Sequence, residues 1–238
     1  MELYIITGTS RGIGLALAKR ALNQPNTAVL GIARTNSFSH PNFKFQQANL
    51  TSVDVVNAIE FPADTGFSKI VLVNNAGMLG DVHHLGEMES QSIIETIAIN
   101  ITAPALLLNR FLNFYAKSKV QKVVINISSG AGRRSIPSWS VYCTTKAALD
   151  MLSKVAQHEQ IERGTNTKIF SVAPGVVDTA MQEQIRSVDK TNFSQVDDFR
   201  ELKQKGLLET SDSVAEKLFR LANQPDKFSE VLLDVRKF

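Results

Sequence analysis

Cysteine and histidine are scarce in this chain of 238 residues, and each shortage excludes a kind of protein. The single cysteine, Cys143, cannot form an internal disulfide, which excludes a disulfide framework and is compatible with a reducing cytosol. His83, His84 and His158 lack the partners and spacing of a metal site. We therefore expect no bound metal and a thiol that only lines a cleft.

The chain also has no large excess of positive or negative charge and no long apolar run. The 26 basic and 23 acidic residues give a net charge of +3 without any basic run, so we expect no nucleic-acid partner. No apolar run reaches the roughly 18 residues of a membrane span. The first expected strand begins at Leu3, which leaves no room for a signal peptide. We expect a cytoplasmic protein without a membrane segment.

Short apolar segments alternate with helical patterns along the whole chain. Strands that are apolar throughout and alternate with helices are typical of a parallel sheet covered on both faces. Right-handed crossovers then give the doubly wound Rossmann arrangement. We expect an α/β fold: one domain over residues 1–238, with a seven-stranded, mainly parallel sheet and helices on both faces. The expected strands are 3–6, 29–33, 43–48, 70–73, 123–127, 168–172 and 231–235, and the expected helices are 13–22, 53–59, 90–98, 103–118, 140–162 and 211–223.

A glycine-rich turn, Thr7–Gly14, follows the first expected strand. Gly8 permits a tight turn, Gly12 lets a pyrophosphate approach the backbone, and Gly14 allows close packing of helix on strand. Free N–H groups and the dipole at the helix start favour phosphates. The turn therefore predicts a dinucleotide site, with a merely structural turn as the alternative.

The end of the second expected strand indicates which dinucleotide binds. An acid usually binds the adenosine ribose of NAD there, but this chain has Arg34 and no carboxylate until Asp54. Arg34 and Arg11 are suited to a 2′-phosphate because a guanidinium is a charged planar fork. We therefore predict NADP(H); two solvated surface arginines are the alternative.

Tyr142 and Lys146 are spaced Y-x-x-x-K in the longest expected helix, thirteen residues after Ser129. Residues four apart share one helix face. A nearby ammonium lowers the pKa of a phenol from its usual value of about 10. The pair therefore predicts a tyrosine that donates and accepts a proton near neutral pH. A half-buried aromatic beside a solvated charge is the alternative.

Together these motifs resemble the short-chain dehydrogenase/reductase family over essentially the whole chain. Asn74–Gly77, Asn100 and Pro174-Gly175 with Thr179 complete the family order. The resemblance implies that Tyr142 protonates a carbonyl oxygen as hydride arrives, Lys146 lowers the tyrosine pKa and binds the nicotinamide ribose, Ser129 holds the substrate oxygen, and Asn100 positions a water behind Lys146. The implied cofactor-binding residues are Gly8, Ser10, Arg11, Gly12, Ile13, Gly14, Arg34, Thr35, Asn49, Leu50, Asn75, Ala76, Gly77, Tyr142, Lys146, Pro174, Gly175, Val177 and Thr179.

Some of these residues have other interpretations. Asn49 stands where the family usually has an aspartate that contacts the adenine amino group, and its carbonyl can accept the same hydrogen bond. Asn100 is also a good helix N-cap residue. Arg133 and Arg134 follow Ser129, and we favour solvated surface charges over a role at the rim of the site.

Several segments resemble the sepiapterin reductase and benzil reductase branch of the family, among them 138–143, 178–182 and 201–206. This implies reduction of one carbonyl of a vicinal dicarbonyl, such as a pterin side chain or a benzil-like diketone. The implied substrate residues are Ser129, Tyr142, Gly175 and Asp234, although an aspartate at the end of a strand near a C-terminus is more often solvated or structural. The polar stretch 182–205, with little regular pattern, would be the substrate lid, and Met181, Ile185, Phe193 and Phe199 would give it an apolar wall.

Other functions remain open. One is a 3-oxoacyl or general carbonyl reductase of the same family; another is a non-catalytic NADP-binding regulatory protein. Family members pair through two long helices, here 103–118 and 140–162, so we expect a homodimer, or else a homotetramer. The apolar residues offered for this contact are Leu106, Leu107, Phe111, Phe114, Leu149, Leu152 and Val155.

Overall fold

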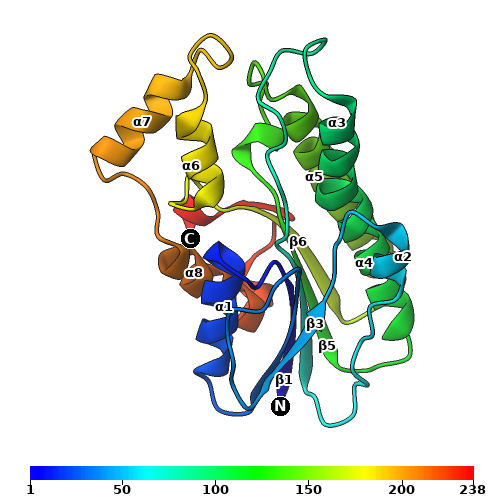
Figure 1. Ribbon diagram of the computed structural model, residues 1–238. Coiled ribbons are helices and arrows are strands. Elements are labelled where there is room, and N and C mark those ends of the chain that lie inside the picture. Colours follow the sequence, from blue (N-terminus) through cyan, green and yellow to red (C-terminus); the bar gives the residue numbers. More distant parts are fainter.

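A seven-stranded sheet lies between two layers of helices in the computed structural model, which describes residues 1–238 (Figure 1). The strands are β1 (Glu2–Thr7), β2 (Thr27–Ala33), β3 (Phe43–Gln47), β4 (Lys69–Asn74), β5 (Gln121–Ile127), β6 (Thr167–Ala173) and β7 (Leu232–Asp234). The helices are α1 (Gly12–Leu22), α2 (Val53–Asn57), α3 (Ser90–Ile97), α4 (Ala103–Phe114), α5 (Ser140–Glu162), α6 (Ala180–Ser187), α7 (Val196–Gln204) and α8 (Ser211–Asn223).

The doubly wound α/β arrangement is confirmed. The strand order is β3-β2-β1-β4-β5-β6-β7, and every neighbouring pair is parallel. The chain moves one way across the sheet from β1 to β3 and the other way from β4 to β7. Such a reversal leaves a crevice beyond the carboxyl ends of β1 and β4, where ligands bind in open α/β sheets.

Each face of the sheet has its own apolar core because side chains alternate along a strand. In β1, Tyr4 and Ile6 join the core beneath α1 and α8, whereas Leu3 and Ile5 join the core beneath α2, α4 and α5. All four side chains are almost completely buried. Burial of a side chain of this size contributes about 1.5–3 kcal/mol, so the sheet and both helix layers hold one another in place.

The stretch 182–205 is more regular than the sequence indicates. It contains most of α6 and all of α7, and Figure 1 shows these two helices above α1 and α8, at the upper left. The expectation of little regular structure is therefore wrong. Each helix buries only a few apolar side chains, Ile185 in α6 with Val196 and Phe199 in α7, so its pattern is hard to see among the charged residues.

One helical stretch is longer and more apolar than expected. A five-residue π-helical turn, Ala98–Thr102, joins α3 to α4, and the 25 residues Ser90–Phe114 have a mean hydropathy of 1.4 in their most apolar window. By length and mean composition alone this stretch is sufficient to cross a membrane, although polar residues interrupt it and it holds no unbroken apolar run of about 18 residues. A core helix of a globular fold meets the same criterion, and 33% of that window is buried here.

The apolar surface of α3, α4 and α5 contains only some of the residues that the sequence indicates. Leu107, Phe111 and Leu149 are buried in the protein's own core, and Leu106 and Leu152 pack against it, so none of these is a free contact residue. Phe114 and Val155 are exposed as expected. Ile94 and Ile97 on α3 and Met151 on α5 are also exposed.

Candidate active site

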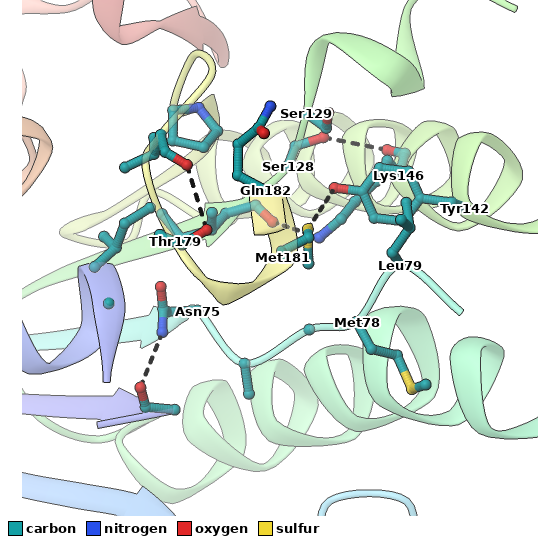
Figure 2. Close-up of a pocket in the computed structure, with 18 of the residues that line it drawn as sticks. Asn75, Met78, Leu79, Ser128, Ser129, Tyr142, Lys146, Thr179, Met181 and Gln182 are labelled. Carbon is teal, nitrogen blue, oxygen red and sulfur yellow. Dashed lines mark hydrogen bonds between the residues drawn. The ribbon is translucent and has the colours of Figure 1, made fainter. Parts of the chain in front are cut away.

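A cavity of about 1210 Å³ lies beyond the carboxyl ends of the strands. The glycine-rich turn, the loop after β4, the loop after β5, the first turns of α5 and the segment between β6 and α6 all line it. Most of the expected site residues therefore meet in one place, although they come from distant parts of the chain. Figure 2 shows several of them around this space.

The glycine-rich turn fits a dinucleotide. Gly8 and Gly12 have positive φ angles of 75° and 59°, which only glycine adopts readily. A Cβ on Gly8 would lie 2.8 Å from Asn75 Nδ2, and that amide donates to the carbonyl oxygens of Thr7 and Gly8. A Cβ on Gly12 would meet only Thr179 Cγ2, at 3.5 Å, so the space in front of Gly12 is open to a ligand. The turn therefore has an open side on which a pyrophosphate fits.

Arg11 and Arg34 both line the cavity, and both are exposed. Both side chains lack hydrogen bonds and ion pairs within the protein. The Arg34 carbonyl accepts a hydrogen bond from Gln47, which fixes the backbone there. Two unpaired guanidiniums at this position suit a phosphate better than a ribose hydroxyl.

Tyr142 and Lys146 lie close together on the first two turns of α5. Lys146 Nζ is 5.7 Å from the centre of the Tyr142 ring and donates to the Ile127 carbonyl at 2.8 Å. Both side chains are buried and line the cavity. The expected juxtaposition is therefore present.

The pKa of the phenol differs from the expectation. Burial raises the pKa of Tyr142 to about 12, although the Ser129 hydroxyl acts in the opposite direction. Burial also lowers the pKa of Lys146 to about 8, opposed by the Asp150 carboxylate. The expected lowering of the tyrosine pKa by Lys146 is thus not found here, because loss of solvent favours the neutral form of both groups. A phenol with this pKa is protonated at neutral pH and is ready to donate.

Ser129 and Asn100 are placed differently from each other. Ser129 lines the cavity, and its hydroxyl accepts from the Ala131 N–H at 3.1 Å. Asn100 is buried behind the cavity wall: its Oδ1 accepts from Met78 N at 2.9 Å, and its Nδ2 donates to Met78 O and Thr145 Oγ1. It sits inside the π-helical turn, so the N-cap interpretation is wrong. π-helical turns occur frequently at functional sites.

Met181, in the first turn of α6, covers the phenol. Tyr142 Oη lies 3.9 Å from Met181 Sδ (Figure 2). Farther along the lid, Phe193 stacks on Trp139 and Phe199 packs against it at a tilt, with ring centres 5.2 and 5.5 Å away. Trp139 meets the Tyr142 ring edge-on. The lid therefore closes on an aromatic cluster that also contains the phenol.

Asp234 and Arg133 each form an ion pair with an oppositely charged side chain. Asp234 lines the cavity, but its carboxylate accepts two hydrogen bonds from the Arg236 guanidinium and one from the Arg236 N–H, and the Arg236 pairing lowers its pKa. Arg133 also lines the cavity and pairs with the buried Asp150 carboxylate at 3.0 Å. Arg133 and Arg134 are both exposed, as expected of surface charges, yet both also line the cavity, and of the two only Arg133 forms an ion pair.

Three expected site residues lie outside the cavity wall: Gly14, Thr35 and Asn100. Gly14 packs instead, since a Cβ there would lie 2.4 Å from the Gly8 oxygen. Asn49 lines the cavity, but its Oδ1 already accepts two hydrogen bonds from Thr51, so it is less free for an adenine amino group than expected.

Trp139, Gln182 and Arg236 are among the cavity residues that the sequence did not assign to the site. Trp139 carried a usable signal as the only tryptophan, three residues before Tyr142. The other two had none, because a glutamine or arginine in a polar stretch is most often solvated.

Comparison with known proteins agrees with this geometry. A family model for short chain dehydrogenases matches residues 2–190. The chain is 34% identical to a benzil reductase ((S)-benzoin forming) of Bacillus subtilis (strain 168), covering 100% of both chains. It is 33% identical to a sepiapterin reductase of Meriones unguiculatus, covering 94% of this chain and 92% of the relative. A short chain dehydrogenase/reductase structure from Saccharomyces cerevisiae has 27% identity and a TM-score of 0.82, covering 99% of this chain and 96% of the other.

Proposed function

This chain belongs to the short-chain dehydrogenase family, and from that premise we propose that it is an NADPH-dependent reductase of a ketone or vicinal dicarbonyl. The observation that carries the proposal is the buried Tyr142–Lys146 pair at the wall of a cavity that begins at the glycine-rich turn. The benzil reductase and sepiapterin reductase relatives favour a dicarbonyl as substrate.

The residues at the wall have separate roles in the proposed reaction. NADPH, when bound, supplies the hydride that goes to the carbonyl carbon. The protonated Tyr142 Oη donates its proton to the carbonyl oxygen, and the Ser129 hydroxyl binds the same oxygen and stabilises its developing charge. Lys146 is held by the Ile127 carbonyl and stabilises the phenolate that Tyr142 becomes. A neutral phenol in the resting state suits this direction of reaction.

Asn100 is a positioning residue for this reaction. It ties the Met78 backbone to Thr145, the residue before Lys146. A Cβ on Gly77 would lie 3.0 Å from Asn100 Oδ1 and 3.6 Å from Lys146 Nζ, so these two side chains nearly meet across that glycine. Asn100 thereby keeps Lys146 and the strand β4 loop in register, and we place the water that returns protons to Tyr142 beside it.

The preference for NADPH over NADH rests on Arg11 and Arg34. Charge-assisted hydrogen bonds from guanidinium to phosphate contribute about 1.5–3 kcal/mol each. Neither arginine has an internal partner to give up, so both are available to the 2′-phosphate. Asp234 stays a proposed substrate residue only if Arg236 releases it.

We also propose a cytoplasmic homodimer. The exposed apolar residues Ile94, Ile97, Phe114, Met151 and Val155 lie on α3, α4 and α5. Exposed apolar patches on long helices favour a partner that covers them. A second copy of the chain in two-fold symmetry is the simplest such partner, and a tetramer is the alternative.

NADPH oxidation in the presence of sepiapterin, benzil and an acetoacetyl thioester tests the proposal. We expect turnover of at least one vicinal dicarbonyl and little with the thioester. Turnover of the thioester alone would identify a 3-oxoacyl reductase. Tight NADPH binding without turnover of any substrate would indicate a non-catalytic binding protein instead.

A further inference from the structure

The first turn of α6 lies directly over the proposed proton donor. Met181 Sδ is 3.9 Å from Tyr142 Oη, which places the thioether where the oxygen of a carbonyl substrate has to bind (Figure 2). A substrate therefore has to displace Met181. The next residue, Gln182, lines the same cavity.

The amide of Gln182 has a known orientation. Gln182 is only 2% exposed, and Arg186 Nη1 donates to its Oε1 at 2.6 Å. A guanidinium only donates hydrogen bonds, so the atom facing Arg186 has to be the oxygen. The Nε2 group, with two N–H donors, is thereby the free end of the amide.

This free end has no acceptor in the protein. Gln182 Nε2 is shielded from solvent and makes no hydrogen bond. A buried donor without a partner costs about 1–3 kcal/mol, and such groups are rare in folded proteins. The cost is removed if a ligand supplies the acceptor, which points to an oxygen on the substrate.

Trp139 Nε1 is a second buried donor without an acceptor in the cavity wall. Its ring is held among Tyr142, Phe193 and Phe199, so the indole has little freedom to follow a ligand. Gln182 instead sits on the turn that has to move with Met181. Of the two donors, Gln182 is therefore the one that can move to meet a substrate as the substrate enters.

We propose that Gln182 selects vicinal dicarbonyl substrates by donating a hydrogen bond to the oxygen that is not reduced. This deepens the proposed function and rests on it. One substrate oxygen binds Tyr142 and Ser129, and the adjacent oxygen binds Gln182 Nε2 once Met181 has moved aside. Arg186 holds the amide so that a donor, not an acceptor, faces the substrate.

The test compares two carbonyl compounds in the complete enzyme with NADPH. 1-Phenyl-1,2-propanedione has the second oxygen, whereas 2,2,2-trifluoroacetophenone is an activated ketone without it. Gln182→Met keeps the shape and removes the donor. We expect its kcat/KM for the diketone to fall about 10-fold while that for the monoketone stays within about 2-fold, the loss of one hydrogen bond. Gln182→Glu places an anionic acceptor there and should discriminate more strongly against the diketone.

Gln184→Leu is the matched control on the same helix. Gln184 is exposed and donates to the Gly80 carbonyl, so its loss perturbs the lid without touching the proposed contact. The ratio of the two kcat/KM values should stay at the wild-type level in this variant. A fall in that ratio equal to that of Gln182→Met would show a general lid effect and overturn the proposal.

A binding measurement supplies a second readout. Trp139 is the only tryptophan and lies against the lid, so its fluorescence reports diketone binding to the complex with NADP⁺, in which no reduction occurs. Gln182→Met should raise the dissociation constant about 10-fold. An unchanged ratio and an unchanged dissociation constant in an active enzyme would refute the role of Gln182 alone, whereas a wild-type protein that reduces neither ketone would refute the proposed function first.

Discussion

The charge of Lys146 is the most testable electrostatic feature of the site, and the perturbation we choose is Asp150→Asn. Asp150 lies one helical turn after Lys146, and its carboxylate is the group that opposes the lowering of the lysine pKa. Its two oxygens accept from Arg133 Nε at 3.0 Å and from Ser171 Oγ at 2.6 Å. Asparagine has the same shape and keeps one of these acceptors, so the fold should tolerate the change.

The size of the effect follows from the helix geometry. Side chains four residues apart on a helix are about 6 Å from each other. At an effective dielectric constant of about 20 to 40, a unit charge at that distance contributes roughly 1.4–2.8 kcal/mol. That corresponds to about one to two pKa units. Because Arg133 partly neutralises Asp150, we expect the lower end, a fall of about one unit in the lysine pKa.

The assay is kcat/KM for carbonyl reduction with saturating NADPH as a function of pH. Lys146 has a pKa of about 8 and must be protonated to stabilise the Tyr142 phenolate, so activity should be constant below that pH and fall as the pH rises through it. In Asp150→Asn the fall should begin about one unit lower. Arg133→Met is the opposing control, because it leaves the carboxylate unpaired and should move the fall to higher pH.

The refuting result is also clear. If both variants keep their thermal midpoints and their pH profiles coincide with that of the wild type, the Asp150 charge does not act on Lys146. A shift to higher pH in Asp150→Asn would refute the sign of the reasoning.

Four further outcomes follow from the site. Tyr142→Phe should remove turnover while leaving the dissociation constant of NADPH, measured by calorimetry, within about 2-fold; retained activity would contradict its role as proton donor. Arg34→Ala should weaken NADPH binding at least 10-fold and NADH binding little, since one charge-assisted hydrogen bond is lost, and equal weakening of both would refute the 2′-phosphate contact. Gly12→Ala should lower the unfolding free energy by about 1–2 kcal/mol because of its positive φ, yet weaken NADPH binding more than 10-fold by filling the open side of the turn, and unaltered binding would show that no phosphate lies there. Met151→Glu should convert a dimer to a monomer in light scattering at equal concentration, and a dimer that persists would place the interface elsewhere.

Much of the fold could be predicted because its strands are short and apolar. β4, for example, is buried at every position and is bounded by polar residues, so its limits are readable from composition alone. The parallel arrangement then follows from the alternation with helices. The helices α6 and α7 could not be predicted in the same way, because each buries only a few apolar side chains against an aromatic cluster that tertiary contact creates.

The site, like the fold, was predictable where local sequence determines it and not where tertiary contacts do. Local motifs located Gly8, Gly12, Ser129, Tyr142 and Lys146, since the backbone or the helix spacing places them. The pKa values of the site residues depend on their whole environment and could not be predicted from the sequence. The sequence suggests that the cation sets the tyrosine pKa, but enclosure of the phenol dominates it.

Pairings between charged side chains were not readable either. Arg133 meets Asp150 from seventeen residues away, and the Arg236 side chain occupies the carboxylate of Asp234. A linear pattern of charged residues does not show which of them are paired in the fold. These pairings decide which charges remain free for a ligand.

The lid has a practical consequence for engineering. Arg200 donates to the carbonyl oxygens of Arg186 and Val188, which ties α7 to the end of α6, so residues 180–204 hold much of their own shape. Most of the acid–base groups come from β5 and α5, outside this segment. The segment is therefore suited to exchange between relatives as a cassette, to change what the enzyme accepts while its proton-transfer machinery stays intact. Phe193 and Phe199 would have to be kept in any such graft, because they are the rings that seat it on Trp139.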